Sequence, residues 1–306
     1  MPIAQSATSS TVRPPAGALL AVVLLSALSP HPTLAAQQTK RSTPATSCDL
    51  ETVASGTVAT VTDGRTFVLD DGREARLPAV EIPALPPAPA QPDAESAASA
   101  AADPPPPPPS DPDAAAAVAL RDLLAGHHVA LRASKLVTDR YGRILADALA
   151  TRDGYPGSAQ KILLSQGLAF LSARPDERGC VAELRTAERT GRSAKLGLWA
   201  DPRYIPRDAE NVAGLSAERG RFTLVEGKVV SVRESGGTIY VNFGKRWSED
   251  FTVTILKRNE RQFIEAGLRP SGLSGRRVMV RGWIEERGGP WIEASGPEQI
   301  EIIAEK

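Results

Sequence analysis

The stretch GTVATVTDGRTFVLDDGREARL, residues 56–77, decides the fold of the first half of the chain. Its β-branched residues cluster in two short runs, 56–62 and 66–69, and a third short run covers 74–77. Asp63-Gly64 and Asp70-Asp71-Gly72 are tight-turn sequences, and they separate these runs. Three short strands joined by tight turns predict an antiparallel meander of the kind that begins an all-β barrel.

Residues 85–113 interrupt this pattern. They hold six consecutive prolines, Pro104 to Pro109, among alanines and scattered acidic residues. A segment with so few large apolar side chains cannot bury a core. We therefore expect an extended or disordered insertion within a loop of a folded domain.

Folded sequence resumes after the insertion. We expect a helix at 114–124, strands at 129–133 and 143–148, a helix at 158–168 with Pro156 in its first turn, and a last helix at 180–196. Five strands with one helix between the third and the fourth are the plan of an OB barrel. Residues 48–200 are therefore predicted to form an OB-fold domain with a five-stranded barrel.

A second unit with the same order of elements follows a polar linker at 201–220. Strands are expected at 223–232, 238–243, 251–256, 277–285 and 291–294, with a short helix at 260–268 before the fourth strand. This repeated order predicts a smaller OB-like barrel at 221–304. The fold class expected for the whole chain is mainly β with helices, α+β.

The first 36 residues have the layout of a secretory signal peptide. An apolar run, Ala18–Leu28, is followed by small residues that resemble a cleavage site, and the run is shorter than the ~20 residues that span a bilayer. The alternative is an uncleaved anchor. We expect a periplasmic or secreted mature chain without a stable membrane span, beginning with a disordered linker at 37–47.

The two cysteines and the scarcity of histidine narrow the chemistry. In an oxidising compartment Cys48 and Cys180 favour a structural disulfide, the alternative being two unrelated buried thiols. The chain has three histidines, of which His127 and His128 are adjacent and would point to opposite faces of a strand. The scarcity and orientation of histidine argue against a zinc site and against hydrolysis that uses a catalytic histidine. The formal net charge of zero indicates no partner by itself.

Four short motifs in residues 48–200 carry a family resemblance. They are Asp63-Gly-Arg-Thr66, Ala75-Arg-Leu77 with the following residues to Pro83, Asp139-Arg-Tyr-Gly-Arg143 before a strand, and the closing Gly197-Leu-Trp199. Their order and spacing resemble the thermonuclease family of staphylococcal-nuclease-like proteins. The resemblance implies a calcium-dependent endonuclease that hydrolyses phosphodiesters of nucleic acids.

The resemblance also implies roles for single residues. Arg76 and Arg143 match the two catalytic arginines that clamp the scissile phosphate, which suits guanidinium groups because negative charge builds on its oxygens. Asp63 and Glu81 match acidic residues that hold calcium, a hard cation that prefers oxygen ligands.

Three positions depart from the family pattern. Arg65 stands where a second calcium-binding aspartate is expected, and Ile82 replaces a threonine. Ala84 stands after Pro83 where the family has its catalytic glutamate. Loss of a general base costs roughly 10²–10⁴-fold in rate. We therefore expect a weakened calcium site and weak or lost cleavage.

Basic and aromatic residues indicate a nucleic-acid partner, single-stranded DNA or RNA. Residues 118–200 and 221–287 each carry more basic than acidic side chains. In the second unit, period-2 alternation puts three residues of one strand on the same face, with ordinary charged sheet exterior as the alternative. The candidate nucleic-acid-binding residues of both units are Arg65, Arg140, Tyr141, Arg277, Arg281 and Trp283.

Three functions are compatible with these patterns. The leading one is an exported thermonuclease-like protein whose endonuclease activity is weak or lost. The second is a non-catalytic envelope protein that binds nucleic acid or another polyanion. The third is an envelope structural or interaction protein that uses the Pro-rich insertion as a contact arm.

Overall fold

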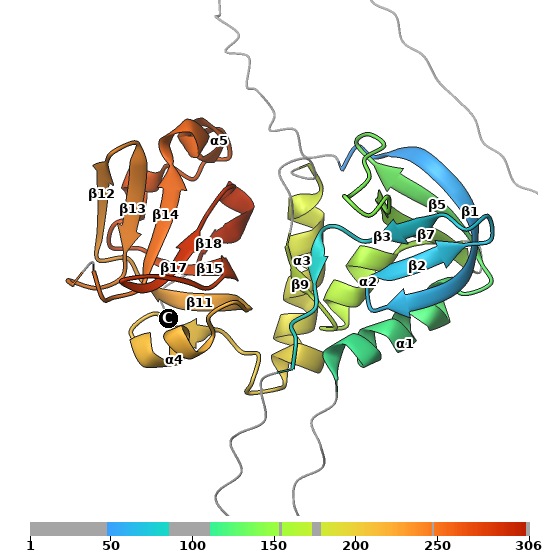
Figure 1. Ribbon diagram of the computed structural model, residues 1–306, viewed down its shortest axis with the longest axis horizontal. Helices are drawn as coiled ribbons and strands as arrows, with labels where there is room; N and C mark the ends of the chain where they lie inside the picture. The colour runs from blue at the N-terminus through green and yellow to red at the C-terminus, as the bar shows by residue number, and fades with distance from the viewer. Residues whose placement is uncertain (1–47, 86–110, 153–154, 173–178, 247, 304–306) are drawn as a thin grey trace, which may run out of the picture. The chain divides into compact units, whose positions relative to one another are not determined.

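The computed structural model describes residues 48–85, 111–152, 155–172, 179–246 and 248–303 (Figure 1). The predicted signal peptide at 1–36, the linker at 37–47 and residues 86–110 of the insertion lie outside these ranges. Within the described ranges, no helix has both the length and the apolar character that crossing a membrane requires.

The predicted meander is present at the start of the described chain. Its strands are β1 (Glu51–Asp63), β2 (Thr66–Leu69) and β3 (Glu74–Arg76). β1 pairs antiparallel with β2 up to Asp63 opposite Thr66, and β2 pairs antiparallel with β3 so that Thr66 lies opposite Arg76. The first turn thereby brings Asp63, Thr66 and Arg76 to one end of the sheet.

The rest of the first sheet comes from sequence beyond the insertion. Its strands are β5 (His128–Ala133), β6 (Ile144–Leu145), β7 (Asp147–Arg152) and β8 (Tyr155–Ser158), and the strand order is β6-β3-β2-β1-β5-β7-β8. β6 and β7 are separated only by Ala146, yet β6 pairs with β3 and β7 pairs with β5. One continuous segment therefore joins both sides of the meander, so the sheet curls back on itself.

This sheet differs from the expected five-stranded barrel in the number of its strands. The last expected strand is divided at Ala146, whose amide nitrogen bonds the Arg76 carbonyl at 3.3 Å, and β8 is added as a hairpin partner of β7. The order of three strands, a helix and two strands is the predicted one. The OB-type plan therefore appears as a curled seven-stranded sheet.

Helices and short strands complete the first half. They are α1 (Pro112–Leu124), α2 (Ala159–Ser165), α3 (Val181–Ser193), a 3-10 turn at Gly197–Trp199, and the two-stranded sheet of β4 (Val80–Glu81) with β9 (Phe170–Leu171). Asp111 caps α1 by accepting from the Asp113 amide, and Ser158 caps α2 by accepting from the Lys161 amide. Pro156, expected in the first turn of α2, lies in β8 instead.

Cys48 and Cys180 form a disulfide. This confirms the predicted pairing, and it ties the chain just before β1 to the residue that precedes α3. Cys180 and its neighbour Leu184 pack into the first hydrophobic core, which lies between the curled sheet and helices α1, α2 and α3.

In the second half the short helix precedes the fourth expected strand, as predicted, but the strands expected at 223–232 and 277–285 are each divided in two, and the two parts belong to different sheets. The main strands of this half are β11 (Phe222–Lys228), β12 (Ser231–Ser235), β13 (Thr238–Asn242), β14 (Thr252–Leu256), β15 (Arg277–Trp283), β16 (Glu285–Arg287), β17 (Gly289–Glu293) and β18 (Ile300–Ile302), with α5 (Glu260–Glu265) after β14. Short 3-10 turns cover Lys257–Asn259, Pro270–Leu273 and Pro297–Gln299. Together with β10 (Arg207–Asp208), these strands form a sheet β10-β11-β15-β18 and a sheet β12-β13-β14-β17-β16, which enclose a second core.

The predicted linker at 201–220 is folded, which corrects the sequence expectation. It contains β10 (Arg207–Asp208), which pairs with β11, and α4 (Val212–Ala217), capped by Asn211. Leu215 of α4 has no exposed surface and belongs to the second core. This mostly polar segment therefore contains three buried residues, Tyr204, Ala209 and Leu215, and two short elements.

The two halves, each with its own core, share a third apolar cluster. Phe170, Leu198 and Trp199 of the first half pack in it with Phe222 and Met279 of the second, and Phe170 and Trp199 meet edge to face at 5.1 Å. By its contacts, the chain from Pro44 to Lys306 forms one compact unit.

Candidate functional site

The turn between β1 and β2 is the centre of the candidate site. Asp63 closes the turn by accepting a hydrogen bond from the Arg65 amide at 2.8 Å, and the Gly64 amide donates to Asp113 of α1 at 3.1 Å. A Cβ atom on Gly64 would lie 2.4 Å from Ile82 and 2.7 Å from Ala116. Glycine is therefore required here, because α1 and the residues after β4 press directly on the turn.

Arg65 turns inward and pairs with Glu81 at the end of β4. Its two terminal nitrogens each donate to a different carboxylate oxygen of Glu81, one of them at 2.9 Å, and Nη1 also donates to the Val80 carbonyl at 3.0 Å. Both side chains are largely buried, with 21% and 12% of their surface exposed. A two-pronged pair of this kind fixes the orientation of both groups.

Arg76 lies beside this pair, on β3. Its Nη1 donates to the Thr66 hydroxyl at 2.5 Å and to Asp63 Oδ2 at 3.3 Å. Burial lowers the pKa of Arg76 below its usual value, the charges of Arg65 and Arg143 lower it further, and Asp63 and Glu81 act in the opposite direction. The three arginines are therefore close enough to act on one another.

Arg143 directly precedes β6, whose parallel pairing with β3 places Leu145 opposite Arg76, so Arg143 lies two positions before the level of Arg76. Asp139 holds it, accepting from the Arg143 amide at 3.1 Å and from its Nε at 2.7 Å. Burial raises the pKa of Asp139, but the hydrogen bonds from Arg143 and the Tyr141 amide outweigh it, so this pKa lies below its usual value.

Tyr141 is the exposed aromatic side chain of this loop. It is 66% exposed, and the guanidinium groups of Arg140 and Arg143 lie 4.8 and 5.0 Å from its ring centre. Arg140 also donates to the Tyr141 hydroxyl at 2.7 Å. The structure thus gathers Arg140, Tyr141 and Arg143 in one loop as a basic surface with an accessible ring, while Arg65 and Arg76 lie at the turn between β1 and β2, within reach of the charge of Arg143.

A comparison with protein-family models agrees with this arrangement. Residues 113–201 match the model described as the staphylococcal nuclease homologue. The chain contains a staphylococcal-nuclease-like domain. No curated protein matches the chain. The matched residues include Arg143 and Tyr141, while Arg76 comes from the preceding sequence and joins the nuclease-like domain through the pairing of β3 with β6.

The residues of this domain do not fit the calcium ion that the family resemblance implies. Among the described residues, no three His, Cys, Asp or Glu side chains are grouped so that they could hold a metal ion. Both oxygens of Glu81 bond Arg65, and Asp63 bonds Arg76 and its own turn. The position that would attract a cation already holds the guanidinium of Arg65.

The position of the expected catalytic base carries no carboxylate. Ala84 is exposed, and its carbonyl and that of Leu85 accept hydrogen bonds from Arg221 at 2.6 and 3.1 Å. Arg221 in turn pairs with Glu218 at 2.9 Å. The second half therefore anchors the nuclease-like domain where the insertion begins. Sequence reasoning did not find Arg221, because its contact joins residues 137 positions apart.

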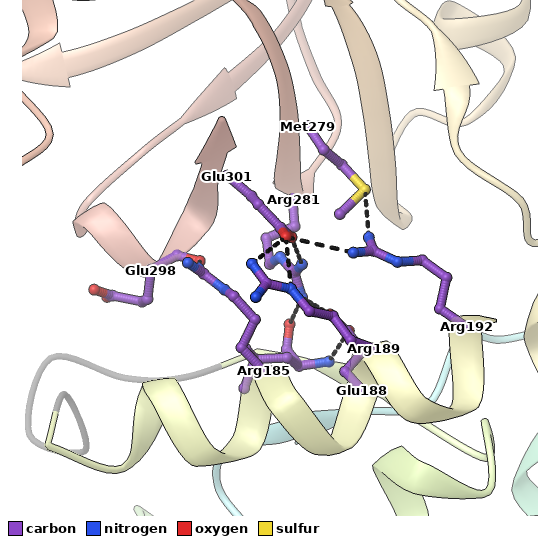
Figure 2. Close-up of polar contacts among 9 residues, drawn as sticks. Arg185, Glu188, Arg189, Arg192, Met279, Arg281, Glu298 and Glu301 are labelled. Carbon is purple, nitrogen blue, oxygen red and sulfur yellow. Dashed lines mark hydrogen bonds and ion pairs between the residues drawn. The ribbon is translucent and has the colours of Figure 1, made fainter. Parts of the chain in front are cut away.

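Of the three candidate nucleic-acid-binding residues in the second half, Arg281 was predicted wrongly. Its side chain is 1% exposed, and it bonds both oxygens of Glu188 on α3, at 2.9 and 3.0 Å, and the Leu171 carbonyl at 3.1 Å (Figure 2). It therefore has no surface for a nucleic acid. The alternation of β15 was correct, since Val278 and Val280 face the second core. The opposite face is covered by α3.

Arg277 and Trp283 lie at the two ends of β15 and remain at the surface. Arg277 pairs with Glu226 at 2.8 Å. Trp283 is 53% exposed and meets Phe222 edge to face at 6.2 Å. Buried residues separate the two side chains along the strand, so they do not form one binding surface.

Proposed function

We propose that the nuclease-like domain holds the phosphodiester backbone of nucleic acid between Arg76 and Arg143 without calcium, and cleaves it weakly or not at all. The pairing of Arg65 with Glu81 beside Arg76 carries this proposal. It puts a fixed positive charge where the family pattern has a calcium-binding aspartate. Guanidinium groups bind phosphate oxygens directly, but they supply no activated water.

Tyr141 supports a single-stranded partner, DNA or RNA. An exposed ring between two guanidinium groups can stack on a base while the arginines contact the adjacent phosphates. The missing carboxylate at Ala84 supports the loss of cleavage, since general-base catalysis contributes roughly 10²–10⁴-fold.

We further propose that the mature chain works outside the cytoplasm. The disulfide between Cys48 and Cys180 supports an oxidising compartment, where such bonds persist. The cleaved signal peptide expected at 1–36 agrees with this location.

The test combines binding and cleavage of one fluorescein-labelled single-stranded DNA by the purified chain, with calcium and with a chelator. We expect salt-sensitive binding of equal affinity in both solutions and no fragments. Arg76→Gln and Arg143→Gln should each weaken binding about tenfold, because a hydrogen bond to a charged group contributes about 1.5–3 kcal/mol.

Arg121→Gln, an exposed position on α1, is the matched control and should leave the affinity unchanged. Fragments that appear only with calcium would contradict the proposal and favour a working nuclease. A chain that neither binds nor cuts the DNA would contradict both the proposed binding function and a working nuclease, and would favour a structural role.

A further inference from the structure

The hairpin of β12 and β13 carries a cavity of about 310 Å³, apart from the site described above. Arg233 and Ser235 of β12 and Tyr240 and Asn242 of β13 line it. In β13 these residues alternate with Ile239 and Val241, which are 3% and 1% exposed and belong to the second core. Since side chains alternate across a strand, the cavity opens on the face of the five-stranded sheet that points away from the core.

Arg233 and Tyr240 are direct partners in the antiparallel ladder. Their Cβ atoms are therefore about 4.5–5.5 Å apart, and the two side chains stand next to each other on one face. The Arg233 side chain is exposed, and among the described residues nothing pairs with its guanidinium group. Glu234 lies on the opposite side of the strand and pairs with Lys257 at 2.6 Å.

Among the lining residues that the structure describes, one is charged and one is aromatic. No carboxylate is among the lining residues that the structure describes, so Arg233 leaves an uncompensated positive charge. Asn242 is fixed, because its amide nitrogen donates to Ser231 at 3.2 Å and its oxygen accepts from Thr252 at 3.4 Å. This set of groups favours an anionic ligand with a flat ring over a neutral sugar.

The other aromatic residue on this face is already covered. Trp291 is 4% exposed, donates to the Thr254 hydroxyl at 2.7 Å and carries the guanidinium of Arg287 over its ring at 3.7 Å. Tyr240 is therefore the ring that a ligand in the cavity can reach.

We propose that this hairpin face is a second nucleic-acid site, which takes one nucleotide of a single strand. Tyr240 stacks on the base, and Arg233 holds the adjacent phosphate. A cavity of about 310 Å³ is at the lower end of the size range of small-ligand sites, so it admits one unpaired nucleotide and excludes a duplex. The site shares no residue with the cluster of Arg65, Arg76 and Arg143, and it does not depend on that cluster.

The test uses the whole chain with the first site disabled by Arg76→Gln and Arg143→Gln. A fluorescein-labelled thymidine oligonucleotide is titrated in chelator at several salt concentrations. We expect remaining affinity, which Tyr240→Ser and Arg233→Gln each weaken about tenfold, since stacking on an aromatic ring contributes about 1–3 kcal/mol per base. Arg233→Gln should also reduce the salt dependence by about one phosphate contact.

Arg261→Gln is the matched control, because Arg261 is exposed on α5 in the same half of the chain and pairs only with its helix neighbour Glu265. It should leave the affinity unchanged. An equal loss in Arg233→Gln and Arg261→Gln, or equal binding of duplex DNA, would overturn the proposal. Binding of neutral oligosaccharides with no binding of the oligonucleotide would do so too.

A second measurement needs no substitution. The unaltered chain is irradiated with an oligonucleotide that carries 5-iodouracil, and cross-linked peptides are identified by mass spectrometry. We expect a cross-link in residues 231–242, and its absence while other peptides are cross-linked would overturn the proposal. A cross-link there with none near Tyr141 would instead refute the proposed function of the nuclease-like domain, so the two failures are distinguishable.

Discussion

At the scale of single residues, Arg65 decides the chemistry of the candidate site. Its guanidinium neutralises Glu81 and lies near Arg76 at the position where the family pattern places a calcium ligand. A fixed cation can attract a phosphate, but it also repels a divalent ion from the two carboxylates beside it. One substitution therefore exchanges a metal site for an organic cation.

We predict that Arg65→Asp creates calcium binding. The variant would present Asp63, Glu81 and the new carboxylate to one another, and mutual repulsion should destabilise it by about 1–3 kcal/mol without calcium. Calcium should restore stability by mass action, which thermal unfolding at increasing calcium measures. Arg65→Met is the control, since it frees Glu81 but adds no oxygen ligand. Equal calcium effects in both variants and in the unaltered chain would count against this account.

The sequence predicted the residues of this cluster better than those of the second half. Asp63, Arg65 and Arg76 lie in a meander whose tight turns are recognisable from short local motifs. Arg143 belongs to a motif that directly precedes a strand, so it too could be found from local sequence. For Arg281, period-2 alternation gave the correct face of β15 but not what covers that face. The covering helix is about 90 residues away, and its partner Glu188 looks like any helical surface acid.

At the scale of elements, Asp147 links β7 to α2. Its side chain is 8% exposed and accepts a hydrogen bond from the Gln160 amide at 3.2 Å, at the start of the helix. Burial raises the pKa of Asp147 to about 6, although Ser158, Gln160 and Lys161 act to lower it. The junction of strand and helix thus contains a carboxyl group that resists ionisation.

We predict that Asp147 makes the folded chain less stable as the pH rises from about 4 to above 6. In this range the folded chain keeps a proton that the unfolded chain, with the usual pKa of 3.8, has lost. The difference corresponds to about 3 kcal/mol. Asp147→Asn should remove this pH dependence of the free energy of unfolding. The stability of the variant relative to the unaltered chain should therefore increase as the pH rises across this range. Urea unfolding at several pH values measures it, and a constant difference would contradict the prediction.

Short elements were the hardest to predict. β10 and β18 have two and three residues, and α4 has six, so each is too short to show a repeated apolar pattern. Long-range pairing with β11 and β15 stabilises the two strands, and the burial of Leu215 stabilises α4. Longer strands and helices with clear alternation or caps were found within a few residues of their predicted positions.

At the scale of the whole molecule, charges and apolar side chains join the two halves. Arg281 and Glu188 form an ion pair with 1% and 0% of their side chains exposed, next to the shared apolar cluster. Glu301 of β18 accepts from Arg189 of α3 at 2.8 Å and lies 3.4 Å from Arg192 (Figure 2). Burial raises the pKa of Glu301, but these arginines outweigh it and hold that pKa below its usual value.

We predict that this contact makes the two halves unfold together. Removing one partner of a buried ion pair leaves the other charge without compensation and costs about 3–5 kcal/mol. Arg281→Met should lose that much in urea unfolding, and Glu188→Gln should lose less, because Glu301 still lies 3.5 Å from Arg281. The double variant should lose less than the sum of the two, because Glu188 and Arg281 are partners. Arg261→Met, at the exposed surface of α5, should have little effect. If this ion pair couples the two halves, each single variant should also unfold in two transitions instead of one. The fluorescence of Trp199 reports the first half, and that of Trp283 reports the second. Additive losses with an unchanged single transition would mean that the shared apolar cluster alone couples the halves.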